Sequence, residues 1–170
     1  MIEVFDNLIT PFDMSHLYRD ARNADFKIGW ADTDIIEQQA DQCLSSEITL
    51  SQYLASPLRS VVESSEITKH IEGYMFRHAV INLSMASHKH HIHTHSPDEK
   101  VVLYYLNLEW QSDWSGDTVF YNNNNSEIIK TVKYKPGRIT VFNGDVNHCI
   151  RPQAMYGPLY RFSITVFLMR

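Results

Sequence analysis

From about residue 72 onward the chain is a series of short apolar segments separated by turn signals, and this pattern constrains the fold most. Residues 101–106 are apolar at every position, as in a strand that is buried on both faces. Further strands are expected at residues 74–85, 118–121, 128–132, 138–142 and 162–168. Turns are indicated by the asparagine run 122–125, by Lys-Pro-Gly at 135–137 and by Asn-Gly-Asp at 143–145. Many short strands at roughly ten-residue spacing predict a β-sandwich or a jelly-roll barrel.

The first 70 residues have a different pattern, which predicts helices with flanking strands. Asp13 is placed to cap a helix whose apolar face carries Leu17 and Ala21. Residues 48–62 repeat apolar side chains at helical spacing, with a break or kink at Pro57. Short strands are expected at residues 4–9 and 26–30, the second followed by an acidic connection through Asp32 and Asp34.

The fold class predicted from these patterns is α+β, mainly β. At 170 residues the chain is most simply one domain, with residues 1–70 as helical support and residues 71–170 as a jelly-roll core that carries the functional site.

Composition excludes several function classes. The net charge of −5, without a basic stripe, argues against a nucleic-acid-binding protein. Two cysteines do not build a disulfide framework. The sequence has no basic segment before an apolar core at its start and no apolar run long enough to span a bilayer. A soluble cytoplasmic protein without a membrane partner is therefore expected.

Five of the nine histidines lie within residues 88–95. In an extended segment, alternation places His93 and His95 on the same face, where two imidazoles can converge on one metal ion. His148 follows the Asn-Gly-Asp turn, and a jelly roll can bring this distant strand end beside the first pair. Three protein ligands leave coordination positions open on iron or zinc, which a catalytic site requires.

Other interpretations of the histidines remain open. His93 and His95 could belong to a surface run that binds metal adventitiously. The remaining members of the cluster are expected to be solvated or to stand behind the ligands, because one ion cannot use all five. The histidines outside the cluster and before it are expected to be structural; they are His16, His70 and His78.

Arg161 opens the last predicted strand, and Ser163 shares its face by alternation. An arginine that points into a barrel beside a hydroxyl is suited to holding a small carboxylate through a forked, charge-assisted pair. The competing interpretation is an arginine at a strand end that forms a surface salt bridge.

These residues together resemble the iron(II)- and 2-oxoglutarate-dependent oxygenases, in particular their prolyl-4-hydroxylase-like branch in bacteria and phages. The resemblance covers roughly residues 74–170. It is carried by His93-Thr94-His95, Tyr104-Tyr105-Leu106-Asn107, Trp110, residues 114–120, residues 135–142, His148 and Arg161-Phe162-Ser163.

The resemblance implies a double-stranded β-helix, which is a jelly roll, with Fe(II) as the metal and 2-oxoglutarate as the cosubstrate. It makes His93 the first metal ligand and His148 the distal one. It assigns the distal carboxylate of 2-oxoglutarate to Arg161, helped by Ser163, with the hydroxyl of Tyr105 within reach of the same group. The expected reaction is O2-dependent hydroxylation of a C–H bond, with a peptidyl proline or another side chain as a candidate; the substrate is unidentified and is either a peptide or a small molecule.

Position 95 departs from the family pattern, because the family's ligand set is two histidines and a carboxylate. His95 could ligate directly, Asp98 or Glu99 could reach the metal instead, or the carboxylate could be lost and the activity altered. We favour direct ligation by His95, which makes His93, His95 and His148 the expected metal ligands. Residues 93–99 also have the His-x-His-x-x-x-Glu spacing of cupins, although no glycine follows Glu99 at the expected distance. A metal-binding jelly roll without catalysis and a structural zinc protein also stay open at this point.

Overall fold

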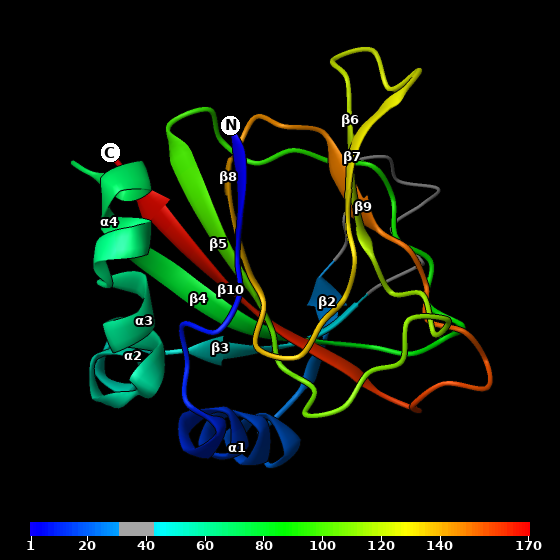
Figure 1. Ribbon diagram of the computed structural model, residues 1–170, viewed down its shortest axis with the longest axis horizontal. Coiled ribbons are helices and arrows are strands. Elements are labelled where there is room, and N and C mark those ends of the chain that lie inside the picture. Colours follow the sequence, from blue (N-terminus) through cyan, green and yellow to red (C-terminus); the bar gives the residue numbers. More distant parts are fainter. Residues whose placement is uncertain (31–42) are drawn as a thin grey trace.

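Two antiparallel sheets face each other in the computed structural model, which describes residues 1–30 and 43–170 (Figure 1). The acidic connection expected through Asp32 and Asp34 lies outside the described residues. Within the described residues, the major sheet has seven strands in the order β1-β8-β5-β10-β4-β3-β2, and the minor sheet has three in the order β7-β6-β9. This is the predicted mainly-β jelly roll.

The strands of the major sheet are β1 (Ile2–Phe5), β2 (Lys27–Trp30), β3 (Cys43–Ile48), β4 (Met75–Ser84), β5 (Glu99–Tyr105), β8 (Ile139–Asn143) and β10 (Arg161–Met169). Those of the minor sheet are β6 (Thr118–Tyr121), β7 (Ile128–Val132) and β9 (His148–Ile150). The first three strands come from the N-terminal 70 residues, so this part of the chain extends the sheet as well as supplying the helices that cover it. Strands β3 and β9 were not expected from the sequence.

In the part of the chain that the structure describes, four helices lie on the side of the major sheet that faces away from the minor sheet: α1 (Pro11–Arg22), α2 (Leu50–Ala55), α3 (Pro57–Val62) and α4 (Ser65–Ile71) (Figure 1). The N-cap of α1 is Thr10 rather than Asp13, because Pro11 fits the first helical position and the Thr10 hydroxyl accepts the amide of Asp13 at 3.1 Å. Pro57 ends one short helix and starts the next, as its missing amide predicts. Among the described residues, no helix is long and apolar enough to cross a membrane.

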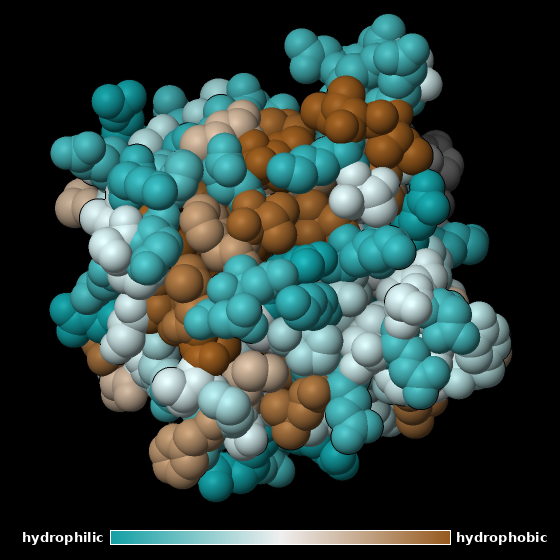
Figure 2. Space-filling model, in the orientation of Figure 1, coloured by the Kyte–Doolittle hydropathy of each residue, from teal (hydrophilic) through white to brown (hydrophobic). Residues whose placement is uncertain are grey.

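Strand β10 lies at the centre of the major sheet and separates two cores. Phe162, Ile164 and Val166 pack with the helices in the outer core. Phe167 joins the core between the sheets, which also contains Tyr105 and Phe120. Apolar side chains are also visible at the surface between β1 and the β6–β7 hairpin in the space-filling view (Figure 2).

Candidate metal and cosubstrate site

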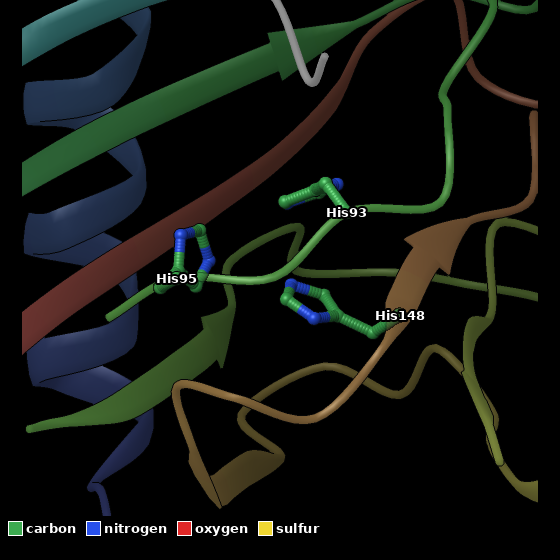
Figure 3. Close-up of side chains that lie close together, drawn as sticks. All are labelled: His93, His95 and His148. Carbon is green, nitrogen blue, oxygen red and sulfur yellow. The ribbon is translucent and has the colours of Figure 1, made fainter. Parts of the chain in front are cut away.

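His93, His95 and His148 point toward one another from two separate segments between the sheets (Figure 3). Their ligand nitrogens all lie within 4.8 Å of one another. The ring centroid of His93 is 5.1 Å from that of His95 and 4.3 Å from that of His148. Since metal–nitrogen bonds are about 2.1 Å long, small side-chain rotations bring the three imidazoles to one ion.

Backbone pairing brings the two segments together. His93 and His148 form an isolated antiparallel bridge in which each amide donates to the other's carbonyl at 3.0 Å. The amide of His95 donates to the carbonyl of Gly144 at 2.6 Å. A Cβ at Gly144 would lie 2.3 Å from the carbonyl oxygen of Ser96, so this close approach requires glycine.

The ring orientation of two histidines is fixed by carbonyl oxygens. Nδ1 of His93 lies 3.0 Å from the carbonyl oxygen of His91, and Nδ1 of His148 lies 2.8 Å from that of Val146. A carbonyl oxygen only accepts, so Nδ1 is the donor in each pair. In the neutral imidazole this leaves Nε2 unprotonated and available to a metal ion.

The three imidazoles line a cavity of about 60 Å³ together with Arg161. Thr118, Thr165 and Asn82 contribute polar atoms to its wall, and the Asn82 amide donates to the Thr165 hydroxyl at 3.0 Å. The described residues that line the cavity include no aspartate or glutamate. Its only fixed charge from these residues is therefore the positive guanidinium.

Arg161 is 1% exposed, and two of its three side-chain nitrogens donate hydrogen bonds. Its Nε donates to the carbonyl of Gly116 at 2.9 Å, and Nη1 donates to the Ser163 hydroxyl at 3.4 Å. The guanidinium lies 4.8 Å from the ring centroid of Tyr134 and 5.7 Å from that of Tyr105. Burial lowers the pKa of Arg161, and the neighbouring Tyr134 and Tyr105 oppose this effect. With an intrinsic pKa above 12, the side chain stays charged at neutral pH.

Nη2 of Arg161 is buried and has no hydrogen-bond partner in the described part of the chain. A buried charged donor without a partner is costly unless a ligand accepts its hydrogen bond. A cavity with this donor and three imidazoles fits an anionic ligand that also reaches a metal ion, as 2-oxoglutarate would. Both implied groups are therefore compatible with the residues present.

Tyr105 and Ser163 contact other residues of the site. The buried Tyr105 hydroxyl donates to the Thr118 hydroxyl at 2.8 Å, and burial raises its pKa. Ser163 accepts a hydrogen bond from Arg161. Both lie beside the residues that line the cavity, and their contact with a cosubstrate stays a prediction.

The acidic residues near the histidines have other positions. Glu99 is 3% exposed; it forms an ion pair with Arg77, and its second oxygen accepts the amide of Ser96 at 3.2 Å. This pairing disfavours both the cupin ligand set and a metal ligand role for Glu99. Asp98 is exposed.

Sequence reasoning missed several residues that line the cavity. Thr165 continues the alternation of Arg161 and Ser163 along β10 and could have been found from that pattern. Thr118 and Asn82 carried no local signal. Cys43 and His90 also line the cavity, and nothing in the sequence links them.

Comparison with known proteins places this site in a family. The model of the 2OG-Fe(II) oxygenase superfamily matches residues 65–169. The chain belongs to this superfamily. It is a non-haem iron, 2-oxoglutarate-dependent dioxygenase, with Fe(II) as its metal and 2-oxoglutarate and O2 as cosubstrates. No curated protein sequence matches the chain.

Solved structures show the same fold at low sequence identity. A prolyl-4-hydroxylase from Pseudomonas putida aligns with a TM-score of 0.68 and 16% identity, over 99% of this chain and 92% of that one. A prolyl hydroxylase from Trichoplax adhaerens, in complex with a hypoxia inducible factor peptide fragment, aligns with a TM-score of 0.58 and 21% identity, over 99% of this chain and 83% of that one. The viral collagen prolyl hydroxylase of Paramecium Bursaria Chlorella virus-1, in its 2OG complex, aligns with a TM-score of 0.64 and 10% identity, over 99% of this chain and 94% of that one.

Proposed function

We propose that this dioxygenase hydroxylates a C–H bond of a peptide or protein side chain, with proline as the first candidate. The shared fold with prolyl hydroxylases supports this choice, since one of them was solved with a peptide. In this proposal His93, His95 and His148 hold Fe(II), and Arg161 binds the distal carboxylate of 2-oxoglutarate. Iron with 2-oxoglutarate supplies the oxidising power for O2-dependent hydroxylation, with succinate as the coproduct.

The single observation that carries the proposed geometry is that Arg161, whose Nη2 has no partner among the described residues, lines the same cavity as the three imidazoles. Arg161 would fix one end of the dicarboxylate, so that the other end is presented to the metal. Tyr134 and Gly116 hold the guanidinium in place, and apolar side chains form much of the remaining cavity wall. Val101, Leu103 and Phe167 form part of this wall.

The test is anaerobic loading with Fe(II), followed by O2, 2-oxoglutarate and a set of proline-containing peptides. We expect succinate to form, and mass spectrometry to find one added oxygen atom on a peptide. Succinate without a modified peptide would contradict the peptidyl substrate. No succinate, together with no binding of 2-oxoglutarate, would contradict the proposed site.

The proposed role of Arg161 in binding 2-oxoglutarate can be tested by substitution. Arg161→Ala should weaken 2-oxoglutarate binding by about a hundredfold, since a charge-assisted pair to a buried partner contributes about 3 kcal/mol. Metal content should stay nearly unchanged, because Arg161 is not a proposed ligand. Titration calorimetry with 2-oxoglutarate and metal analysis measure the two effects separately.

Arg161→Lys provides a second variant in case the alanine variant does not fold. Lysine keeps the positive charge but lacks the two parallel N–H donors of the guanidinium, so we expect a smaller loss of 2-oxoglutarate affinity than in Arg161→Ala. Arg151→Gln, at an exposed position in the β9–β10 loop, is the matched control and should bind 2-oxoglutarate normally. An equal loss of metal and cosubstrate in Arg161→Ala would overturn the assigned role.

A further inference from the structure

A cysteine and a histidine outside the proposed ligand set face the same cavity. Cys43 begins β3 and is 6% exposed, and His90 belongs to the histidine-rich loop before His93. Sγ of Cys43 lies 3.8 Å from Nδ1 of His90. Both side chains line the cavity that holds the three imidazoles and Arg161.

This pair has the arrangement of an activated thiol. The reactive form of cysteine is the thiolate, and a neighbouring imidazole promotes it by accepting the thiol proton. At 3.8 Å the sulfur and the nitrogen are within hydrogen-bonding range for a thiol. The guanidinium of Arg161 adds positive charge to the same cavity, and positive charge also favours a thiolate.

We infer that Cys43 is a covalent modification site, activated by His90, that reacts with small disulfides and electrophiles entering the cavity. With a disulfide, the Cys43 proton moves to Nδ1 of His90 and the thiolate attacks one sulfur. A new S–S bond forms, the old one breaks, and the leaving thiolate takes the proton back from His90. The Cys43 thiol is oxidised to a mixed disulfide, and the small disulfide is reduced to one thiol.

The adduct would occupy space that the cosubstrate needs. The cavity measures about 60 Å³, so a group attached to Cys43 takes up a substantial part of it. Bound 2-oxoglutarate should therefore shield Cys43, and modified Cys43 should bind 2-oxoglutarate weakly. This consequence rests on the proposed function, whereas the reactivity of the thiol does not.

Cys149 supplies an internal reference within the same chain. It is 7% exposed, close to the value for Cys43, but its sulfur lies 3.5 Å from the Tyr121 hydroxyl and has no place in the cavity lining among the described residues. The two thiols therefore differ in their neighbours rather than in their exposure to bulk solvent.

The test is the rate of iodoacetamide labelling of each cysteine in the folded, metal-free protein, followed by peptide mass spectrometry. Cys43 should react faster than Cys149. A thiol with an ordinary pKa of about 8.5 is roughly 3% thiolate at pH 7, and a neighbouring imidazole that accepts the proton raises this fraction. Loss of His90 should therefore slow the labelling of Cys43 by about tenfold. His90→Gln and His90→Asn both test this, so that a folding defect in one variant leaves the other to decide.

His88→Gln is the matched control, because His88 belongs to the same loop but lies outside the described lining of the cavity. It should leave the rate at Cys43 unchanged. The inference would be overturned if Cys149 were labelled as fast as Cys43. It would also be overturned if Cys43 were labelled at the wild-type rate in both folded His90 variants. Addition of 2-oxoglutarate with Zn²⁺ should also protect Cys43 from labelling. If the labelling rate depends on His90 but this addition gives no protection, the proposed cosubstrate site is wrong and the reactive thiol is supported.

Discussion

At position 95 an imidazole stands where the family's ligand set has a carboxylate, and in the proposed site this residue determines the charge at the metal. The structure directs His95 toward His93 and His148, while Glu99 is engaged with Arg77. An ion held by three imidazoles keeps its full positive charge, whereas an aspartate would neutralise part of it. The iron affinity of this site is therefore expected to be lower than that of a site with the carboxylate.

His95→Asp should raise the affinity for Fe(II) by about tenfold, which corresponds to about 1.4 kcal/mol. Anaerobic Fe(II) titration measures the change, and succinate formation should rise with it. His90→Asp is the control, because it introduces the same charge into the cavity wall from a residue outside the triad. An equal gain in both variants would mean that general charge, rather than ligation at position 95, controls iron binding.

Gly116 lies where two side chains leave no room for a Cβ. Its φ is +79°, and an added Cβ would lie 2.8 Å from the Trp110 ring and 3.3 Å from Nε of Arg161. Gly116→Ala should therefore displace the guanidinium, raising the KM for 2-oxoglutarate while leaving Fe(II) affinity unchanged. The expected loss of stability is about 1–3 kcal/mol, from backbone strain and overpacking.

Gly73 is a suitable control because its φ is +78° and a Cβ added there would have no atom within 4 Å. Gly73→Ala carries the same backbone strain without the contact. Only Gly116→Ala should change the KM for 2-oxoglutarate in steady-state assays, and a similar KM in both variants would refute the steric explanation.

At the scale of elements, the sequence predicted most individual strands but did not identify which strands pair. Residues 101–106 and 162–168 have dense apolar patterns, and both lie largely in strands. Strand β3 was missed because residues 48–62 carry a helical repeat directly after it, which obscured its end at Ile48. Strand β9 has only three residues, too few for a periodic pattern.

Strand β1 is attached to the major sheet by an ion pair as well as by its backbone. The carboxylate of Asp6, just after β1, accepts from Nε of Arg138 at 2.9 Å and from Nζ of Lys135 at 3.0 Å. The Arg138 hydrogen bond is the main cause that lowers the pKa of Asp6 from 3.8 to about 2. The ion pair of Asp6 therefore contributes its full stabilisation of the folded state above pH 3.8, and this contribution is lost as the pH falls toward 2.

Asp6→Asn should lower the free energy of unfolding at pH 7 by about 1 kcal/mol, a value kept small by the partial exposure of these side chains. The difference from the wild type should shrink between pH 4 and pH 2, where the wild-type carboxylate is protonated. Urea unfolding over this range measures it. Asp20→Asn, on an exposed turn of α1, should show no comparable pH-dependent difference. A constant difference at all pH values would exclude the ion pair as its cause.

At the scale of the whole molecule, the site depends on contacts between segments that are distant in sequence. Strand β10 is last in the chain but lies between β4 and β5, and β1 pairs with β8. Apolar patterns identify which face of a strand is buried but not which strands are adjacent. The sequence therefore indicated His148 and Arg161 as candidates without specifying the cavity between them. The family resemblance supplied that arrangement. Cys43 and His90 became neighbours only through the folded chain.

A metal ion at the three histidines would link the loop before β5 to β9, which belongs to the minor sheet. Zn²⁺ or Mn²⁺ at a hundred times its dissociation constant should stabilise the protein by about 2.7 kcal/mol, because the unfolded chain lacks the assembled site. The thermal midpoint should rise with the metal and fall again on chelation.

His148→Ala should abolish this rise in differential scanning calorimetry. His16→Ala is the control, since His16 lies on α1 and packs against Phe12 with a centroid distance of 4.3 Å. It should keep the full metal response. A metal-dependent rise that survives in His148→Ala would place the binding elsewhere in the chain.

The carbonyl groups that orient His93 and His148 have a consequence for how this enzyme can vary. In each case the accepting oxygen belongs to the backbone two residues earlier. Substitution of a side chain leaves a backbone carbonyl in place, so no single replacement elsewhere deletes the partner of either ring. The Nδ1–H tautomers of the two proposed ligands therefore do not depend on the identity of any neighbouring side chain.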